Sequence, residues 1–187
     1  MDLGKLTQQL TDASPTRQLP PVDKWDPPFC GDMNLVIKSN GQWWHEGTPF
    51  TRAKLVSLFS SVLKKEGDGY FLVTPVEKIG IQVEDVPFVI VDWRFEKEAL
   101  IVKTQIGDEV EIGPDHPVEL RPFAAENADA EGATPLVPYC LIRRNLWARL
   151  HQNVMYQWAE IATPTSTEKG NELLIKSKQY TFSLGEF

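Results

Sequence analysis

Thr74, Glu77 and Lys78 form the first group of residues in this sequence that could do chemistry. They surround Pro75, which interrupts the strand-forming run from Tyr70 to Trp93. Proline fixes φ and removes a backbone donor, so we expect a turn or bulge there, and such interruptions often lie beside binding sites. The same pattern suits a capped edge strand whose Glu77 and Lys78 are merely solvated. Both interpretations stay open.

Arg52 and Arg143 are the next candidates, because each lies near the start of a predicted helix. A planar guanidinium at such a position can hold a phosphate, helped by free backbone N–H groups and the positive end of the helix dipole. Arg144 could take the role of Arg143. The alternative is that both arginines only solvate helix ends or form surface ion pairs.

Asp85, His116 and Tyr139 complete the set of candidate ligand-binding residues. Asp85 could bind a ribose hydroxyl or orient an arginine, or it could form an ordinary Asx turn. His116 could act as a general base, but no nucleophile can be paired with it, and a turn residue is the other interpretation. Tyr139, like Trp43 and Trp44, could stack on a base or simply fill the core.

Composition and motif content argue against several classes of protein. The 187 residues include 42% hydrophobic and 24% charged residues, which is typical of a globular protein. A net charge of −7 argues against a nucleic-acid polymer as partner. No Gly-rich dinucleotide fingerprint, Walker A motif, GxSxG elbow or HExxH motif occurs, so we assign no catalytic residue. Three scattered histidines and two cysteines predict no metal site, and we expect no cofactor.

The cysteines and the N-terminus bear on the compartment. Cys30 and Cys140 are far apart and lack CxxC spacing, so we expect a reduced pair, with one long-range disulfide as the alternative. The chain begins without a basic segment followed by an apolar one, and no apolar run approaches about 20 residues. We therefore expect a cytoplasmic protein that is neither exported nor membrane-spanning.

The elements that would position these residues divide the chain into three parts. Residues 1–30 predict a short N-terminal helix and an extended proline-rich arm anchored by Trp25. Residues 31–86 predict a first α+β unit, and residues 87–187 predict a second one that includes an acidic loop at 124–134.

The order of elements in the two units is similar. In the first unit the sequence predicts a hairpin over 35–45 with a tight type I′ turn at Asn40-Gly41, a helix over 52–66 and strands over 70–83. In the second unit it predicts strands over 110–120, a helix over 142–162 and strands over 173–184. The strands over 88–104 would join the units. We therefore predict an α+β fold of two related ββαββ units, an internal duplication, although the same order can arise by chance.

Several short blocks of sequence resemble a known bacterial family. The blocks are Pro21-Val22 with Trp25, Cys30-Gly31-Asp32, Leu72–Lys78, Val83–Phe88, Gly113-Pro114 with His116-Pro117, and Pro138-Tyr139. In this order they resemble the family called domain of unknown function 1285, from about Pro20 to Gly185. The chain departs from the family at Ser177-Lys178, in a turn that the family often makes with glycine, which leaves the geometry of that turn open.

The resemblance implies a duplicated α+β core whose second half is loosely similar to pleckstrin-homology-like folds. It also implies a cleft between the halves, proposed to bind a nucleotide-type ligand in signal transduction or stress response. It implies no activity.

Together these observations predict a non-enzymatic, ligand-responsive regulatory protein. A small nucleotide-type anion would bind between the units and be shared by Arg52 and Arg143. One alternative is a protein-interaction adaptor that uses an exposed sheet edge and binds no small ligand. Another is an enzyme that acts on a small phosphorylated substrate. A membrane is not an expected partner.

Overall fold

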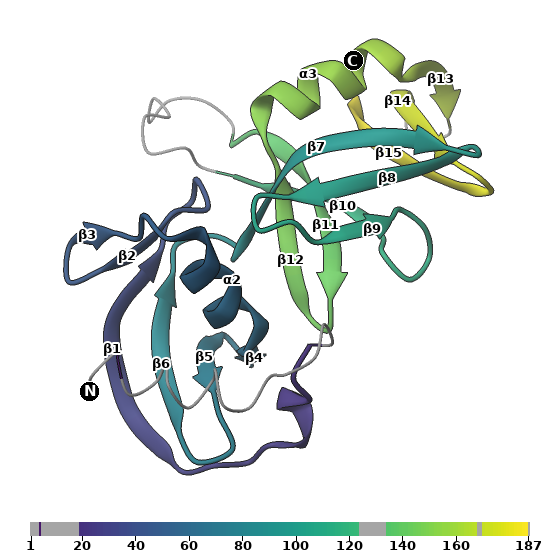
Figure 1. The fold of residues 1–187 in the computed structure, drawn as a ribbon. Helices are drawn as coiled ribbons and strands as arrows, with labels where there is room; N and C mark the ends of the chain where they lie inside the picture. The colour runs from purple at the N-terminus through teal and green to yellow at the C-terminus, as the bar shows by residue number, and fades with distance from the viewer. Residues whose placement is uncertain (1–3, 5–18, 124–133, 168–169, 187) are drawn as a thin grey trace. The chain divides into compact units, whose positions relative to one another are not determined.

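The computed structural model describes residues 4, 19–123, 134–167 and 170–186. The chain forms two compact units, Met1–Pro87 (unit 1) and Phe88–Phe187 (unit 2), and each is described by itself (Figure 1). The described residues are mostly β with two α-helices, so the predicted α+β class is confirmed. The helix expected near the N-terminus and nearly all of the acidic loop at 124–134 lie outside the described residues.

Unit 1 is built on one six-stranded sheet in the order β3-β2-β1-β6-β5-β4. The central strands β1 and β6 are parallel, and every other neighbouring pair is antiparallel. Helix α2 lies against one face of the sheet (Figure 1). The elements of unit 1 are η1 (Val22–Lys24), β1 (Phe29–Ile37), β2 (Trp43–His45), β3 (Thr48–Pro49), α2 (Ala53–Ser61), β4 (Leu63–Glu66), β5 (Gly69–Val73) and β6 (Lys78–Val83).

The core of unit 1 follows the period-two pattern of its strands. Ile79 and Ile81 are buried on the face of β6 that points to the core, together with Leu72 of β5 and Phe59 of α2. The described part of the proline-rich arm contains the 3₁₀ turn η1, and Val22 is fully buried there, whereas the expected anchor Trp25 is only half-buried.

The predicted hairpin is present, but its turn differs from the prediction. Ile37 pairs with Trp43, and the Gly41 N–H donates to the Lys38 carbonyl at 2.8 Å. Gly41 has a φ of 84°, whereas Asn40 has no positive φ. The connection is therefore a type I turn followed by a left-handed glycine, not a two-residue type I′ turn.

Helix α2 is shorter than predicted. It ends at Ser61, because the chain then pairs with β5, placing Leu63 opposite Leu72 and Glu66 opposite Gly69. The helix-forming residues Lys64 to Glu66 thus adopt a strand, and tertiary pairing overrides their local propensity.

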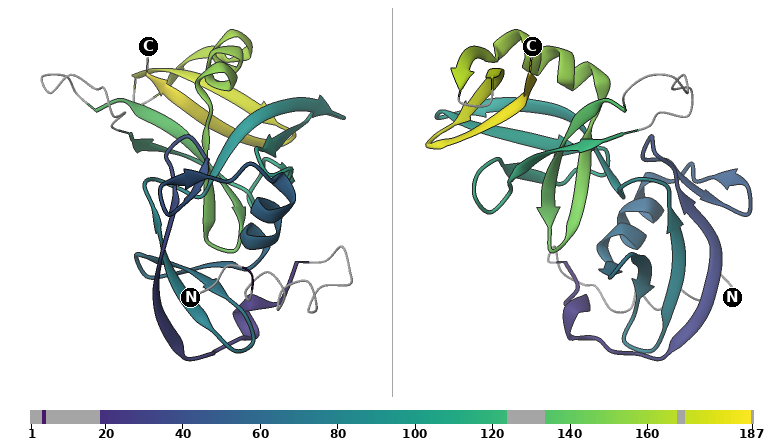
Figure 2. Two further views of the ribbon diagram at one scale, coloured as in Figure 1. Left: turned by 60° about the vertical axis from the view of Figure 1, so that its left-hand side comes forward. Right: turned by 180° about the vertical axis from the view of Figure 1, so that it is seen from behind.

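Unit 2 contains a six-stranded sheet in the order β10-β11-β12-β7-β8-β9 and a separate three-stranded sheet in the order β13-β14-β15. The larger sheet is strongly curled, and α3 and the smaller sheet lie beside its β7–β8 ribbon (Figure 2). Trp158 of α3 and Phe182 of β15 meet in the core with ring centroids 5.5 Å apart. The elements are β7 (Phe88–Glu96), β8 (Ala99–Thr104), β9 (Glu109–Glu111), β10 (Val118–Pro122), β11 (Leu136–Arg143), β12 (Leu146–Leu150), α3 (Gln152–Ile161), β13 (Thr163–Thr167), β14 (Gly170–Ser177) and β15 (Tyr180–Glu186).

The helix predicted over 142–162 is wrong in its first half. Leu146 to Leu150 form β12, which pairs with β11 and runs parallel to β7, and the helix begins only at Gln152. Leu146, Ala148 and Leu150 are buried, which is the alternation of a strand. The strands over 88–104, expected to join the units, belong to unit 2.

Unit 1 has three strands, one helix and three strands, whereas unit 2 has six strands before α3 and three after it. The order of unit 1 recurs from β10 to β15, which is consistent with an internal duplication. The sheets around the helices nevertheless differ. In unit 1 the strands before and after α2 share one sheet, whereas in unit 2 the strands after α3 form a sheet of their own. The pleckstrin-homology-like likeness of unit 2 stays a prediction. In the described part of the chain, no helix is long and apolar enough to span a membrane.

Candidate functional site

Thr74 closes the turn between β5 and β6. Its side chain is fully buried, and its hydroxyl oxygen accepts a hydrogen bond from the Glu77 N–H at 3.0 Å. The Thr74 N–H in turn donates to the Glu77 carbonyl at 2.9 Å. These bonds use the polar groups of Thr74 inside the turn, which supports the structural interpretation of the Pro75 interruption.

Lys78 is engaged by a neighbouring carboxylate on the exposed face of the unit 1 sheet. Its ammonium group lies 2.9 Å from one oxygen of Glu66, and Lys64 lies 2.9 Å from the other. The two ammonium groups lower the pKa of Glu66 through hydrogen bonds from Lys64 and Lys78. Lys78 also lies 5.2 Å from the centre of the Phe71 ring. The charge of Lys78 is therefore balanced within the unit.

Arg52 and Asp85 both lie in unit 1 but at different elements, Arg52 before α2 and Asp85 after β6. Arg52 is the N-cap residue of α2, as predicted, and its side chain is exposed and makes no capping hydrogen bond. Asp85 is half-buried in the bend after β6. Its neighbour Glu84 accepts hydrogen bonds from Lys38 at 2.6 Å and from the Ser39 N–H at 2.9 Å.

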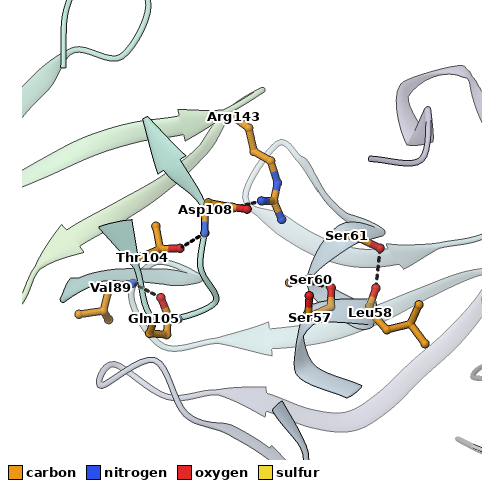
Figure 3. Close-up of polar contacts among 9 residues, drawn as sticks. All are labelled: Ser57, Leu58, Ser60, Ser61, Val89, Thr104, Gln105, Asp108 and Arg143. Atoms are coloured by element: carbon orange, nitrogen blue, oxygen red, sulfur yellow. Dashed lines mark hydrogen bonds and ion pairs between the residues drawn. The ribbon is translucent and has the colours of Figure 1, made fainter. Parts of the chain in front are cut away.

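Arg143 lies at the end of β11 and not at the start of a helix, so its predicted equivalence to Arg52 is wrong. It forms an ion pair with Asp108 (Figure 3). Its guanidinium also lies 4.8 Å from the centre of the Phe88 ring. Burial, and to a lesser extent the nearby charge of Arg144, lower the pKa of Arg143 to about 10, although an adjacent carboxylate favours the charged form. Arg143 therefore remains a cation at neutral pH, and Asp108 is its counter-ion.

The loop that carries Asp108 is tightly bonded. Thr104 is buried, and its hydroxyl oxygen accepts the Asp108 N–H at 3.1 Å (Figure 3). The side chain of Gln105 accepts the Val89 N–H at 2.8 Å, which ties the loop to β7. Arg143 is thus part of a fixed internal arrangement.

His116 and Tyr139 also have structural contacts. His116 Nδ1 lies 2.9 Å from the Leu141 carbonyl oxygen, beside the bridge between His116 and Gly113. Tyr139 is buried, and the Arg121 guanidinium lies 5.5 Å from its ring. The predicted residues therefore fall at several places in two units, and only Thr74, Glu77 and Lys78 share one local structure.

A site that the sequence did not predict lies at the tips of two hairpins in unit 2. A hollow of about 270 Å³ is lined by Phe95, Glu98, Lys176 and Lys178. A second hollow of about 510 Å³ is lined by Glu111, Ile112, Gly113, Pro114, Ser177, Lys178, Gln179 and Tyr180. Lys178 lines both. We call this pair of hollows the twin-tip site.

The two hairpin tips are held in unusual backbone conformations. Glu96 pairs with Ala99, and the two residues between them, Lys97 and Glu98, have φ values of 49° and 67°, as a type I′ turn requires. At the tip between β14 and β15, Lys178 has a φ of 51°. The Lys178 N–H donates to the Glu98 carbonyl at 2.9 Å and joins the tips.

The charges of the twin-tip site are mixed. Lys178 lies 2.5 Å from Glu111, and both side chains are about half exposed. Lys176 is exposed and has no ion pair in the part of the chain that the structure describes. Phe95 contributes a ring that is 50% exposed. The site thus combines cations with ring and apolar surface.

Comparison with known proteins now identifies the family. A model for the N-terminal domain of the domain of unknown function DUF1285 matches residues 20–86, and one for the C-terminal domain of DUF1285 proteins matches residues 87–184. The chain belongs to the DUF1285 family. The predicted resemblance is therefore confirmed.

Two solved structures of DUF1285 family proteins are similar to this chain. The one from Silicibacter pomeroyi DSS-3 is 32% identical, with a TM-score of 0.81, and the match covers 98% of this chain and 94% of that one. The one from Shewanella baltica OS155 is 30% identical, with a TM-score of 0.52, covering 68% of this chain and 91% of that one. No curated protein matches.

The sequence left open the geometry of the turn at Ser177-Lys178 in this DUF1285 protein. Lys178 adopts the left-handed conformation that glycine favours. The contact between Lys178 and Glu98 had no signal in the sequence, because it joins two hairpins that are distant in sequence.

Proposed function

We propose that this DUF1285 protein is a non-enzymatic regulatory protein that binds a small nucleotide-type anion at the twin-tip site of unit 2. The observation that carries the proposal is the position of Lys178, which lines both hollows, with Lys176 beside it. Ammonium groups bind phosphate as point charges. The larger hollow adds Ile112, Pro114 and the ring of Tyr180, which suit a planar group.

The site differs from the one expected from sequence. Arg143 already has a counter-ion in Asp108, so we do not assign it to the ligand. The cleft expected between the units stays a prediction. The lining of the two hollows contains no histidine or cysteine, and the Ser177 hydroxyl is engaged in hydrogen bonds, which favours binding over catalysis.

Thermal unfolding with a panel of AMP, ADP, GDP and inorganic pyrophosphate tests this function. A ligand that binds only the folded chain stabilises it by about 2.7 kcal/mol at a concentration 100 times its Kd, which raises Tm by about 5–10 °C. We expect the increase in the wild-type chain and its loss in Lys176→Ala. Lys103→Ala is the matched control, since Lys103 is an exposed lysine of β8 outside the hollows. Unchanged Tm across the panel would reject the function.

A second candidate, a protein-interaction adaptor, is favoured by the exposed face of unit 1. Phe29 is 55% exposed and packs edge to face on Phe71 at 6.2 Å. Large exposed aromatic side chains are typical anchors of protein interfaces. Loss of a co-purifying partner in Phe29→Ser, without any response to the ligand panel, would favour this candidate.

A further inference from the structure

The ion pair between Glu111 and Lys178 lies where an anionic ligand would bind. Glu111 ends β9 and lines the larger hollow, and its carboxylate lies 2.5 Å from the ammonium group shared by both hollows. Side-chain exposures of 50% for Lys178 and 44% for Glu111 put the pair in contact with water. Exposed pairs of this kind contribute little to stability, so a ligand can break this one at small cost.

The charges that line the site balance in the free protein. Lys176 and Lys178 supply two positive charges, and Glu98 and Glu111 supply two negative ones. A neutral or singly charged ligand therefore gains little from the lysines. A group with two or more negative charges can displace the Glu111 carboxylate, because it interacts with both ammonium groups at once.

The apolar residues of the larger hollow would position the ring of a bound ligand. Tyr180 is held by its hydroxyl oxygen, which accepts the Val118 N–H at 3.2 Å, and by stacking on Phe182 at 5.9 Å. Ile112 and Pro114 complete the apolar part of the lining. A ring in this hollow would place an attached phosphate beside Lys178, which the two hollows share.

We infer that Glu111 is an internal counter-ion that occupies Lys178 in the free protein and is displaced by the phosphate of the ligand. This inference rests on the proposed function and refines it in two ways. The ligand class is a ring-bearing compound with at least two negative charges, such as a nucleoside mono- or diphosphate. The affinity of the site is set by competition with Glu111.

Isothermal titration of the full chain with ADP, pyrophosphate and adenosine tests this inference. Glu111→Gln removes the competing charge and retains the side-chain shape, so ADP should bind about two- to fivefold more tightly. Glu109→Gln is the matched control. Glu109 lies on the same strand, loses the same charge, and is paired with Arg94 instead. Its ADP affinity should equal that of the wild type, and adenosine should bind no variant.

Lys178 supplies the second arm of the test. Lys178→Ala should weaken ADP binding about tenfold, and Glu111→Gln should have no further effect in that background. Equal ADP affinity of the wild type, Glu111→Gln and Glu109→Gln would reject the counter-ion role and leave the proposed function standing. Weaker binding by Glu111→Gln would also reject it, since Glu111 would then contact the ligand favourably. Absence of binding by the wild type and by Glu111→Gln would reject the proposed function itself.

Discussion

Ser177 donates a hydrogen bond of 2.7 Å to the carbonyl oxygen of Ile112, although the two residues are 65 positions apart. The same hydroxyl oxygen accepts the Leu100 N–H at 3.0 Å. One buried side chain therefore satisfies backbone groups from two other segments and holds the tip of β14 against β8 and the end of β9. The twin-tip site depends on these hydrogen bonds, because they hold the tip between β14 and β15 beside the tip between β7 and β8.

Replacing Ser177 with alanine should be strongly destabilising. The Leu100 N–H and the Ile112 carbonyl would remain buried without a partner, and each such group costs about 1–3 kcal/mol. We expect Ser177→Ala to lower the free energy of unfolding by about 2–4 kcal/mol, measured by urea denaturation. Ser166→Ala is the control, because Ser166 is exposed and should change stability by less than about 0.5 kcal/mol. Equal stability of the two variants would contradict the prediction.

Gly80 and Asp32 should be energetically coupled in unit 1. They pair across β6 and β1, and a Cβ added to Gly80 would collide with a carboxylate oxygen of Asp32. Gly80→Ala must therefore displace the Asp32 carboxylate, whereas in an Asp32→Ala background it only adds a side chain to a strand interior. We expect a coupling free energy of about 0.5–1.5 kcal/mol in a double-mutant cycle. Additive effects within about 0.3 kcal/mol would disprove the coupling.

The left-handed backbone conformation at position 178 should make glycine more stabilising than alanine there. A φ of 51° is strained for residues with a Cβ, at a cost on the order of 1 kcal/mol. Both Lys178→Gly and Lys178→Ala lose the Glu111 ion pair, so their difference isolates the backbone term. We expect Lys178→Gly to be more stable than Lys178→Ala by about 1 kcal/mol in urea denaturation.

Lys176 provides the matched comparison for this backbone effect. It lies in β14, where it pairs with Thr181 and has no positive φ. Glycine in a strand interior is worse than alanine by about 0.5–1 kcal/mol, so the order of the two variants should reverse at this position. The same order at both positions would show that the φ of Lys178 is not what decides its preference.

The sequence predicted a helix where β12 lies, because the spacing of its apolar residues fits the period of a helix as well as that of a strand. Leu146 and Leu150 are four positions apart, which places them on one face of either a helix or a strand. Ala148 is buried between them, so the strand is correct, but alanine is a weak signal for either structure. The hairpin over 35–45 and the strands over 70–83 were predictable, because turns at Asn40-Gly41 and Thr74-Pro75 separate strongly apolar runs, whereas β4, β11 and β13 were not predicted.

The twin-tip site was less predictable than the fold. Lys178 meets Glu98 through a backbone hydrogen bond and Glu111 through an ion pair, and both contacts depend on how sheets pack. No local spacing encodes such contacts. Arg143 illustrates the opposite error, since its chemistry suits a phosphate, but the partner Asp108 comes from a distant loop.

The buried thiol of Cys140 should make the free energy of unfolding fall at alkaline pH. Burial raises the pKa of its thiol from 9.0 to about 12, so above about pH 9 the unfolded chain releases a proton that the folded chain retains. Stability is thus lost as pH rises from about 9 toward 12, by about 1 kcal/mol between pH 9 and 10. Urea denaturation at both pH values should show this loss in the wild type and about 1 kcal/mol less of it in Cys140→Ala. Identical pH dependence in the two proteins would exclude the thiol as the cause.

Asp108 and Arg143 should respond unequally to substitution. The Arg143 side chain is 10% exposed and that of Asp108 is 28% exposed, so the guanidinium depends more on its partner than the carboxylate does. Asp108→Asn would leave a buried cation with a neutral neighbour, and we expect a loss of about 2–4 kcal/mol in urea denaturation. Arg143→Met keeps an unbranched apolar side chain against Phe88 and leaves Asp108 with access to water. We expect a smaller loss for Arg143→Met.

The double variant Asp108→Asn with Arg143→Met separates the charge effect from packing. Since the buried cation is absent, this variant should recover most of the stability that Asp108→Asn loses. Additive losses in the double variant would mean that Asp108 stabilises unit 2 through its loop and not through the charge of Arg143. Recovery would instead identify Asp108 as the counter-ion that makes a buried arginine tolerable in unit 2, which is the reason we place the ligand elsewhere.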